Sequence, residues 1–393
     1  MMELKKSIFR ANFFTTGMAM FAMFFGSGNL IFPLGVGKIA GDQIAWAILG
    51  LIITAVLIPF STLCLMLLYN GDYDRFFKRL GKYPGKIIAF STLALIGPFG
   101  VLPRCIAFSH STLSLYFPSV DLFTYSLLAC LLIFFLTIKR NDVVGLIGNF
   151  LTPVLILSLA FMVIKGLMIK PSAEPVFNDA SALSMVKFGL IEGYKTFDIF
   201  AALFFSSAII PAFRMVLGDK LEHCKKSLLK LALKSSLVGM ACLIVVYGGL
   251  GLVAAQFNGS LSEVPGDKLL GTLAKLTMGE KAGLVANIIV SMACLTTAIS
   301  LALVSAEFFK KEIFGKKFSY STCLTITMVI SFIFSLLGFD GIMRMAIPLL
   351  MVMCPAVITL VMVNALNYFY GFKYVRVPFY GIFFISFVAL LLS

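Results

Sequence analysis

Residues 21–33 read FAMFFGSGNLIFP, and this stretch interrupts an apolar run that covers about positions 13–36. The run is long enough to cross a bilayer, because about 20 apolar residues in a helix span a hydrocarbon core of about 30 Å. Its middle, however, holds the helix-weakening sequence GSGN at 26–29, followed by Pro33. Lipid cannot hydrogen-bond to the freed backbone groups, so a broken spanning helix needs protein, an ion or a cavity to satisfy them. We therefore predict a binding site at this break.

The composition is that of a polytopic membrane protein. The 393 residues are 60% hydrophobic and only 13% charged, which excludes an ordinary soluble globular domain. The first apolar run is too long for the core of a cleavable signal peptide and lacks a cleavage site of small residues, so we expect it to be the first spanning helix. The eight cysteines form no CxxC pair, and only two histidines occur. We therefore expect no metal centre and no disulfide framework.

The apolar runs predict an all-α fold with about eleven transmembrane helices. They lie at about 11–36, 44–69, 87–116, 121–138, 143–169, 184–213, 231–256, 282–307, 319–338, 341–366 and 377–392. Residues 256–281 form the longest loop on the external side. Its stretch LLGTLAKLTMGEKAG is either an amphipathic helix lying on the membrane or a solvated connection.

The formal net charge of +14 is explained by membrane topology. Lysine and arginine accumulate in cytoplasmic loops, and here they gather in alternate loops. These groups lie at positions 5–10, 75–86, 139–140, 214–234, 310–317 and 373–376. We therefore place the N-terminus in the cytoplasm and expect no nucleic-acid partner.

A second unusual helix follows five spans after the first. The stretch Val186–Phe213 carries Glu192, Lys195 and Asp198 inside or beside an apolar run. Broken helices in corresponding positions of two halves are typical of transporters built from inverted repeats. We therefore expect a single transmembrane transporter domain over 1–393. Its five-helix inverted repeats would cover about 11–169 and 184–366, with an accessory helix at about 377–392.

Two broken helices offer defined chemistry. The half-helix that begins near Gly28–Asn29 would expose free N–H groups and a positive dipole end, which suit a carboxylate. Carbonyl groups freed around Ala22–Gly26 suit a hard cation such as Na⁺. Hydroxyl groups from the eighth span could complete its oxygen shell, and the candidates are Ser291, Thr296, Thr297 and Ser300.

The motifs GSGNLIFP in the first span and GYKTFDIFAAL in the sixth resemble those of the branched-chain amino acid:cation symporters, the bacterial LIVCS (BrnQ-type) carriers. The resemblance implies a LeuT-type fold with interrupted helices 1 and 6. It also implies uptake of leucine, isoleucine and valine across the bacterial cytoplasmic (inner) membrane, coupled to Na⁺ or to H⁺. We assign substrate binding to both breaks, at Gly26, Ser27, Gly28, Asn29, Tyr194, Thr196, Phe197 and Asp198.

The same resemblance implies a sodium site between the first break and the eighth span. Carried over from LeuT-type Na⁺ symporters, its ligands would be the carbonyls of Ala22, Phe25 and Ala293 and the hydroxyls of Thr296 and Thr297. The alternative for the two threonines is a hydrogen bond back to a carbonyl of their own helix.

Two charged residues leave alternatives open. Asp198 either faces the substrate ammonium or the ion, or forms a salt bridge with Lys195 three residues earlier. Arg104 follows Gly97, Pro98, Gly100 and Pro103 in a third span that we expect to be bent. This arginine either snorkels to the interface or pairs with an acid.

The sequence thus predicts a secondary transporter whose partners are a small amino acid and the lipid bilayer. It has no GxxxxGK[ST] loop, so we expect neither an ATP step nor an ATPase subunit. The alternatives are an integral-membrane transferase, which would need clustered histidine, aspartate or cysteine, and a channel, which would need rings of acids along a pore.

Overall fold

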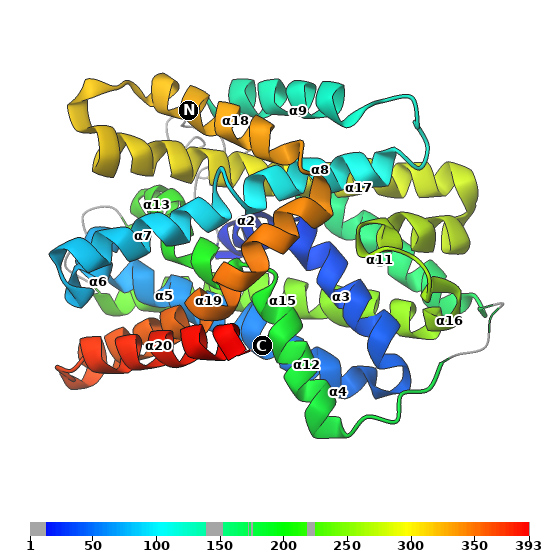
Figure 1. Cartoon of the computed structure of the whole chain (residues 1–393), viewed down its shortest axis with the longest axis horizontal. Helices are drawn as coiled ribbons and strands as arrows, with labels where there is room; N and C mark the ends of the chain where they lie inside the picture. Colours follow the sequence, from blue (N-terminus) through cyan, green and yellow to red (C-terminus); the bar gives the residue numbers. More distant parts are fainter. Residues whose placement is uncertain (1–12, 139–151, 172, 174–175, 218–224, 393) are drawn as a thin grey trace, which may run out of the picture.

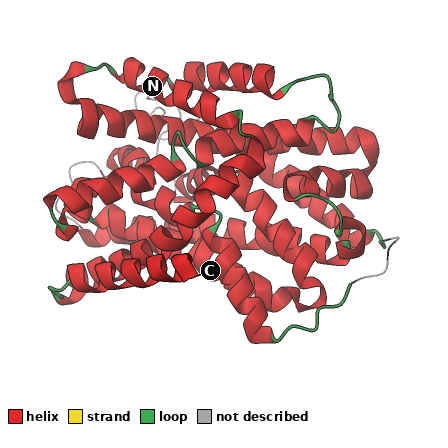
Figure 2. Cartoon of the chain, in the orientation of Figure 1, coloured by secondary structure: helices red, strands yellow, loops and turns green. Residues whose placement is uncertain are grey.

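The computed structural model describes residues 13–138, 152–171, 173, 176–217 and 225–392, and within these ranges all regular secondary structure is helical (Figures 1 and 2). The first half of the chain forms α2 (Phe13–Phe24), α3 (Ser27–Ala40), α4 (Ile44–Ile52), α5 (Ile58–Leu68), α6 (Tyr73–Phe77), α7 (Lys82–Ile96), α8 (Val101–Leu113), α9 (Leu122–Thr137) and α11 (Thr152–Met168). The second half forms α12 (Ala182–Tyr194), α13 (Asp198–Leu217), α15 (Lys225–Gln256), α16 (Asn258–Leu261), α17 (Leu269–Phe308), α18 (Tyr320–Ser335), α19 (Gly338–Tyr370) and α20 (Arg376–Leu392).

The predicted all-α class is confirmed. In the described part of the chain, five helical segments are long and apolar enough to cross a membrane, or six if the bent pair α12–α13 counts as one span. Shorter apolar helices accompany them, namely α2, α9, α18, α20 and the Ile156–Met168 part of α11. The count of eleven spans stays a prediction. The basic residues at 5–10, Lys139, Arg140, Lys220 and the start of the run at 143–169 lie outside the described residues.

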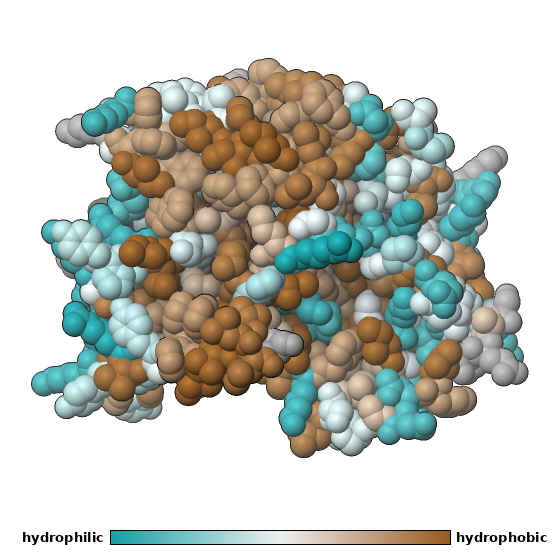
Figure 3. Space-filling view, viewed as in Figure 1, coloured by the Kyte–Doolittle hydropathy of each residue, from teal (hydrophilic) through white to brown (hydrophobic). Residues whose placement is uncertain are grey.

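The outer helices present apolar side chains at the surface. Leu128 and Phe135 of α9 are exposed, as are Phe384 and Leu391 of α20. Figure 3 shows hydrophobic residues spread over much of one face of the molecule. A soluble protein of this size seldom exposes so many large apolar side chains, whereas lipid tails accommodate them. The surface is therefore suited to the interior of a bilayer.

The interrupted helices lie at the centre of the helix bundle. Helix α15 packs along both α2 and α3, α12 packs against α4, and α13 packs against α5. A π-helical turn, Ile53–Leu57, joins α4 to α5, and its Thr54 hydroxyl donates to the carbonyl of Leu190 in α12 at 3.0 Å. Helix α17 lies beside this group and packs against α8. The packing thus groups the first, second, sixth and seventh spans into one bundle.

The segment that we expect to form the longest external loop contains a helix. Helix α17 begins at Leu269 and is kinked at Gly279, whose φ is 76°. Leu270 and Leu273 of its first part are buried against the protein, while Leu276 is exposed. The stretch is therefore helical, with one face packed against the protein.

Candidate functional site

The first span is interrupted at the predicted place. Helix α2 ends at Phe24 and α3 begins at Ser27, slightly before the start expected near Gly28–Asn29. The N–H of Gly26 donates to Oδ1 of Asn29 at 3.1 Å, so Asn29 satisfies the backbone donor that precedes its own helix. The next N–H groups, in the first turn of α3, have no carbonyl four residues earlier to bond within the helix. The break therefore presents donors at the centre of the protein.

The sixth span is also interrupted. Helix α12 ends at Tyr194 and α13 begins at Asp198, with a bend of 43° between them. Phe197 has a φ of 68°, in the left-handed region that is costly for a residue other than glycine. The Thr196 hydroxyl donates to the carbonyl of Gly193 at 2.9 Å and accepts from the N–H of Asp198 at 3.4 Å. A strained turn, held by a threonine, thus replaces the helix here.

The side chain of Asn29 connects the two breaks. Its Nδ2 donates to Oδ2 of Asp198 at 2.6 Å and also to the hydroxyl of Tyr247 in α15. Lys195, by contrast, pairs with Glu192, with 2.5 Å between Nζ and Oε1. The alternative of a salt bridge between Asp198 and Lys195 is therefore wrong, because the helix is interrupted between Tyr194 and Asp198 and the two side chains do not share one helix face. Asp198 is buried, with 4% exposure, and it faces the first break.

A narrow cavity lies between the breaks. Of the residues assigned to the substrate, Gly26, Ser27, Asn29, Thr196, Phe197 and Asp198 line it. Tyr194 lies half-buried at the end of α12, and Gly28 is packed against Arg104. The cavity measures only about 10 Å³, far less than an amino acid occupies. The walls would have to move apart to admit an amino acid.

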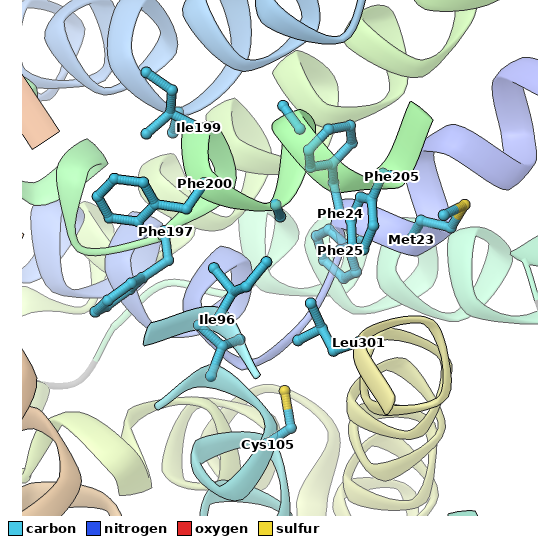
Figure 4. Close-up of a cluster of buried hydrophobic side chains, with 14 of the residues drawn as sticks. Met23, Phe24, Phe25, Ile96, Cys105, Phe197, Ile199, Phe200, Phe205 and Leu301 are labelled. Atoms are coloured by element: carbon cyan, nitrogen blue, oxygen red, sulfur yellow. The ribbon is translucent and has the colours of Figure 1, made fainter. Parts of the chain in front are cut away.

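Most of the rest of the cavity wall is apolar, apart from Arg104 and Thr297. The side chains of Met23, Phe24, Ile96, Phe205 and Leu301 line it and come together in Figure 4. The sequence could not say which phenylalanines line a pocket. Phe24 and Phe197 do so, whereas Phe21 stacks on Phe25, with 4.9 Å between ring centroids. A polar corner beside an apolar wall suits a small molecule with a charged end and an aliphatic end.

The eighth span contacts the first break through its two threonines. The Thr296 hydroxyl lies 2.7 Å from the carbonyl of Ala293 and 3.3 Å from that of Ala22. The Thr297 hydroxyl lies 3.5 Å from the carbonyl of Ala22 and 3.3 Å from that of Met23. Of the residues assigned to Na⁺, Ala22, Ala293, Thr296 and Thr297 therefore lie together, and the carbonyl of Met23 joins them. The Phe25 carbonyl is not among the groups that the two hydroxyls contact. Thr296 also makes the hydrogen bond to its own helix that we considered as the alternative.

Arg104 is the residue that the sequence did not place. Its side chain is 1% exposed, and it donates from Nε to the Ser27 hydroxyl at 3.2 Å. Nη1 donates to the carbonyl of Lys195 at 2.8 Å, and Nη2 to that of Thr196 at 3.2 Å. Snorkelling is wrong because the guanidinium is buried, and its hydrogen bonds go to neutral oxygen atoms and not to an acid. Arg104 instead caps the free carbonyls at the second break.

The expected bend of the third span puts Arg104 there. Helix α7 ends at Ile96 and α8 begins at Val101, with the sequence GPFG between them. A Cβ on Gly100 would stand 1.9 Å from the carbonyl oxygen of Leu95, so only glycine fits this turn. Arg104 follows in the first turn of α8, where the bend points it into the bundle.

Comparison with known proteins decides the family. The family model "Branched-chain amino acid transport protein" matches residues 9–392, nearly the whole chain. The chain belongs to this family. It is 31% identical over 356 residues to the branched-chain amino acid permease BrnQ of Corynebacterium glutamicum, covering 90% of this chain and 80% of that protein.

Solved structures give the same fold. The chain is similar to Mhp1, a nucleobase-cation-symport-1 family transporter, with a TM-score of 0.63 and 13% identity over 98% of this chain and 92% of the other. It is also similar to MhsT in complex with L-phenylalanine, with a TM-score of 0.54 and 17% identity over 97% of this chain and 98% of the other. The fold is therefore LeuT-type, as expected, and the chain is a multi-pass membrane protein. Since this family consists of transporters, the transferase alternative is excluded.

Proposed function

We propose that the protein imports leucine, isoleucine and valine, or similar apolar amino acids, driven by a Na⁺ gradient, with H⁺ as the alternative driving ion. The observation that carries this proposal is the meeting of two interrupted helices at one cavity, joined by the hydrogen bond from Asn29 to Asp198. Backbone polarity released inside a spanning bundle is costly unless something uses it. A zwitterionic amino acid and its driving ion would bind the backbone N–H and C=O groups that the two breaks leave free.

The amino acid fits the cavity in one orientation. Its carboxylate would lie at the first turn of α3, where free N–H groups and the positive end of the helix dipole favour an anion. Its ammonium would lie near Asp198, and its aliphatic chain would contact Phe24, Phe205 and Leu301. The apolar wall offers no hydrogen-bond partner to a polar side chain, so it favours leucine over a polar amino acid.

The driving ion would bind beside the first break. Thr296 and Thr297 supply two hydroxyls, and Ala22 and Ala293 supply carbonyls, which is the oxygen-rich set that hard cations prefer. The Phe25 carbonyl would complete the shell if the break turned slightly. Because Ala22 belongs to α2 and the threonines to α17, an ion here would hold the two helices together.

Transport would follow from alternating access. The bundle of the first, second, sixth and seventh spans would rock against the remaining helices, with the cavity between them. We further propose that the protein lies in the cytoplasmic membrane with its N-terminus in the cytoplasm. Its inverted repeats would cover about 11–169 and 184–366. It would need neither an ATPase subunit nor a nucleic-acid partner.

Uptake into proteoliposomes tests this function. Labelled leucine should accumulate above its outside concentration when Na⁺ is imposed outside, and a Na⁺ ionophore should abolish the accumulation. If an imposed pH gradient drives uptake in the absence of Na⁺, the driving ion is H⁺. Leucine entry that only equilibrates under either gradient would favour a channel, and no uptake of any apolar amino acid would refute the substrate class.

A variant of the ion site sharpens that test. Thr297→Ala removes one hydroxyl and should raise the Na⁺ concentration for half-maximal uptake by about tenfold, the value of one lost charge-assisted interaction. Thr322→Ala, which removes a hydroxyl at the exposed start of α18, is the control and should leave the Na⁺ concentration for half-maximal uptake unchanged. Equal behaviour of the two variants would remove Thr297 from the ion site.

A further inference from the structure

Two opposite charges line the cavity without pairing with each other. Arg104 and Asp198 are its charged lining residues, and both are buried, with 1% and 4% exposure. Asp198 receives a hydrogen bond from Asn29, while Arg104 donates to Ser27 and to two backbone carbonyls. Separated buried charges are expensive within a membrane protein and are found where they serve a ligand or each other. Here no hydrogen bond or ion pair joins the two side chains, so each keeps capacity for a ligand.

The guanidinium has bonding capacity to spare. It carries five N–H groups, of which three donate to oxygen atoms. A fourth contact, from Nη1 to the sulfur of Met343 at 3.7 Å, is weak. Nη2 has one recorded acceptor, the Thr196 carbonyl, which leaves it a second N–H for a ligand. A carboxylate is the group that such an edge binds best.

That edge lies over the start of α3. A Cβ on Gly28 would stand 2.6 Å from Nη2 of Arg104, so the guanidinium reaches the first turn of the half-helix only because residue 28 has no side chain. The same turn holds backbone N–H groups without an intrahelical acceptor. Two independent sets of donors, one from a side chain and one from a helix end, therefore meet at one corner of the cavity.

Two aromatic rings hold the guanidinium in place. Its carbon lies 5.0 Å from the centroid of Phe197 and 5.8 Å from that of Phe32. Together with the carbonyl bonds, these contacts fix the plane of the group and lower the entropy that a ligand would otherwise have to remove.

We propose that Arg104, together with the first turn of α3, binds the carboxylate of the transported amino acid, while Asp198 faces its ammonium across the same cavity. The bound amino acid then lies between the two charged side chains, with its ammonium at Asp198 and its carboxylate at Arg104. This inference rests on the proposed function and adds a residue that determines specificity: the protein selects α-amino acids over amines of the same shape.

The test compares leucine with leucinamide, which keeps the ammonium and the size of leucine but has a neutral amide in place of the carboxylate. Dissociation constants are measured by calorimetry on the purified full-length protein. In the unsubstituted protein, leucinamide should bind about 10- to 100-fold more weakly than leucine, the worth of a charged hydrogen bond. In Arg104→Gln, the dissociation constant of leucine should rise by a similar factor while that of leucinamide changes little. The ratio of the leucinamide constant to the leucine constant therefore falls towards one.

Matched variants separate binding from folding. Arg75→Gln also removes an arginine that stacks on an aromatic ring, that of Tyr69, but Arg75 is exposed and does not line the cavity. The ratio of the two dissociation constants in this variant should therefore equal that of the unsubstituted protein. If Arg104→Gln does not fold, Gly28→Ala displaces the guanidinium without removing its charge and should also lower the ratio. Gly35→Ala is its control on the same helix, since no atom lies within 4 Å of a Cβ there.

The outcomes are distinguishable. Equal binding of leucine and leucinamide to the unsubstituted protein would overturn the inference while leaving the proposed function intact. A fall in affinity for both ligands by the same factor in Arg104→Gln would also overturn it and make Arg104 only a cap of α12. If neither ligand binds the unsubstituted protein, the proposed function itself fails.

Discussion

The two interrupted helices are built in opposite ways. At the first break, the residues that weaken the helix also satisfy it, because Asn29 accepts the hydrogen bond from Gly26, three residues earlier. At the second break, the turn contains a phenylalanine in a strained conformation, and its free carbonyls are satisfied by Arg104 from another span. The Gly26 N–H at the first break is thus satisfied locally, whereas the carbonyls of Lys195 and Thr196 at the second break depend on a side chain from another span. The two should respond differently to substitution.

A substitution at Asp198, which joins the two breaks, should have the largest effect on leucine uptake. Asp198→Asn keeps the shape of the side chain but removes the charge that would face the ammonium, and leucine uptake should fall by about 100-fold or more. The protein should still insert and elute as a single species in size-exclusion chromatography. Asp340→Asn, an exposed acid in the first turn of α19, is the control and should transport normally. Normal uptake by Asp198→Asn would limit Asp198 to holding the breaks together.

The first break should tolerate no added methyl group. In Gly26→Ala the new Cβ would stand 2.9 Å from Oγ1 and 3.0 Å from Cγ2 of Thr297. Overpacking of this kind costs about 1–3 kcal/mol, so uptake should fall by about tenfold. Adding Thr297→Ser removes Cγ2, keeps the hydroxyl and should restore part of the activity. Uptake is measured with Gly35→Ala as the control, and an equal loss in that variant would mean that α3 resists any change at its glycines.

The sequence predicted both breaks but not the arginine that satisfies the carbonyls of the second. The GSGN break and the acid at position 198 stand out because each violates the rules for a spanning helix over a few residues. The Thr297 hydroxyl contacts the carbonyl of Ala22, which the sequence assigned to the ion, and that of Met23, which it did not; the assignment of Phe25 stays a prediction. Lys195 was a plausible partner for Asp198 only on a continuous helix. Arg104 approaches a carbonyl 92 positions away, and nothing in its own segment encodes that contact.

The second break should show backbone strain. Phe197→Gly and Phe197→Ala both remove the ring that stacks on Arg104, and both should lower stability. Glycine, however, adopts a positive φ without steric cost, so the glycine variant should be more stable than the alanine variant by about 1 kcal/mol. Thermal unfolding of the purified protein measures the difference. The opposite order would mean that the turn relaxes to an ordinary conformation once the ring is gone.

The smallest effect should come from the ion pair beside the second break. Glu192 lies in the last turn of α12 and Lys195 directly follows that helix; their side chains are 13% and 22% exposed, and neither lines the cavity. The contribution of Lys195 to the site is its backbone carbonyl, which accepts from Arg104 and is kept in any substitution. The double variant Glu192→Gln, Lys195→Met should therefore lose about 1 kcal/mol of stability or less, as is usual for a partly exposed pair. Its KM for leucine should stay within about twofold, since no charge–charge contact to the substrate is lost. A large rise in KM would place the lysine side chain in the path of the substrate, and the local account of Lys195 would then be wrong.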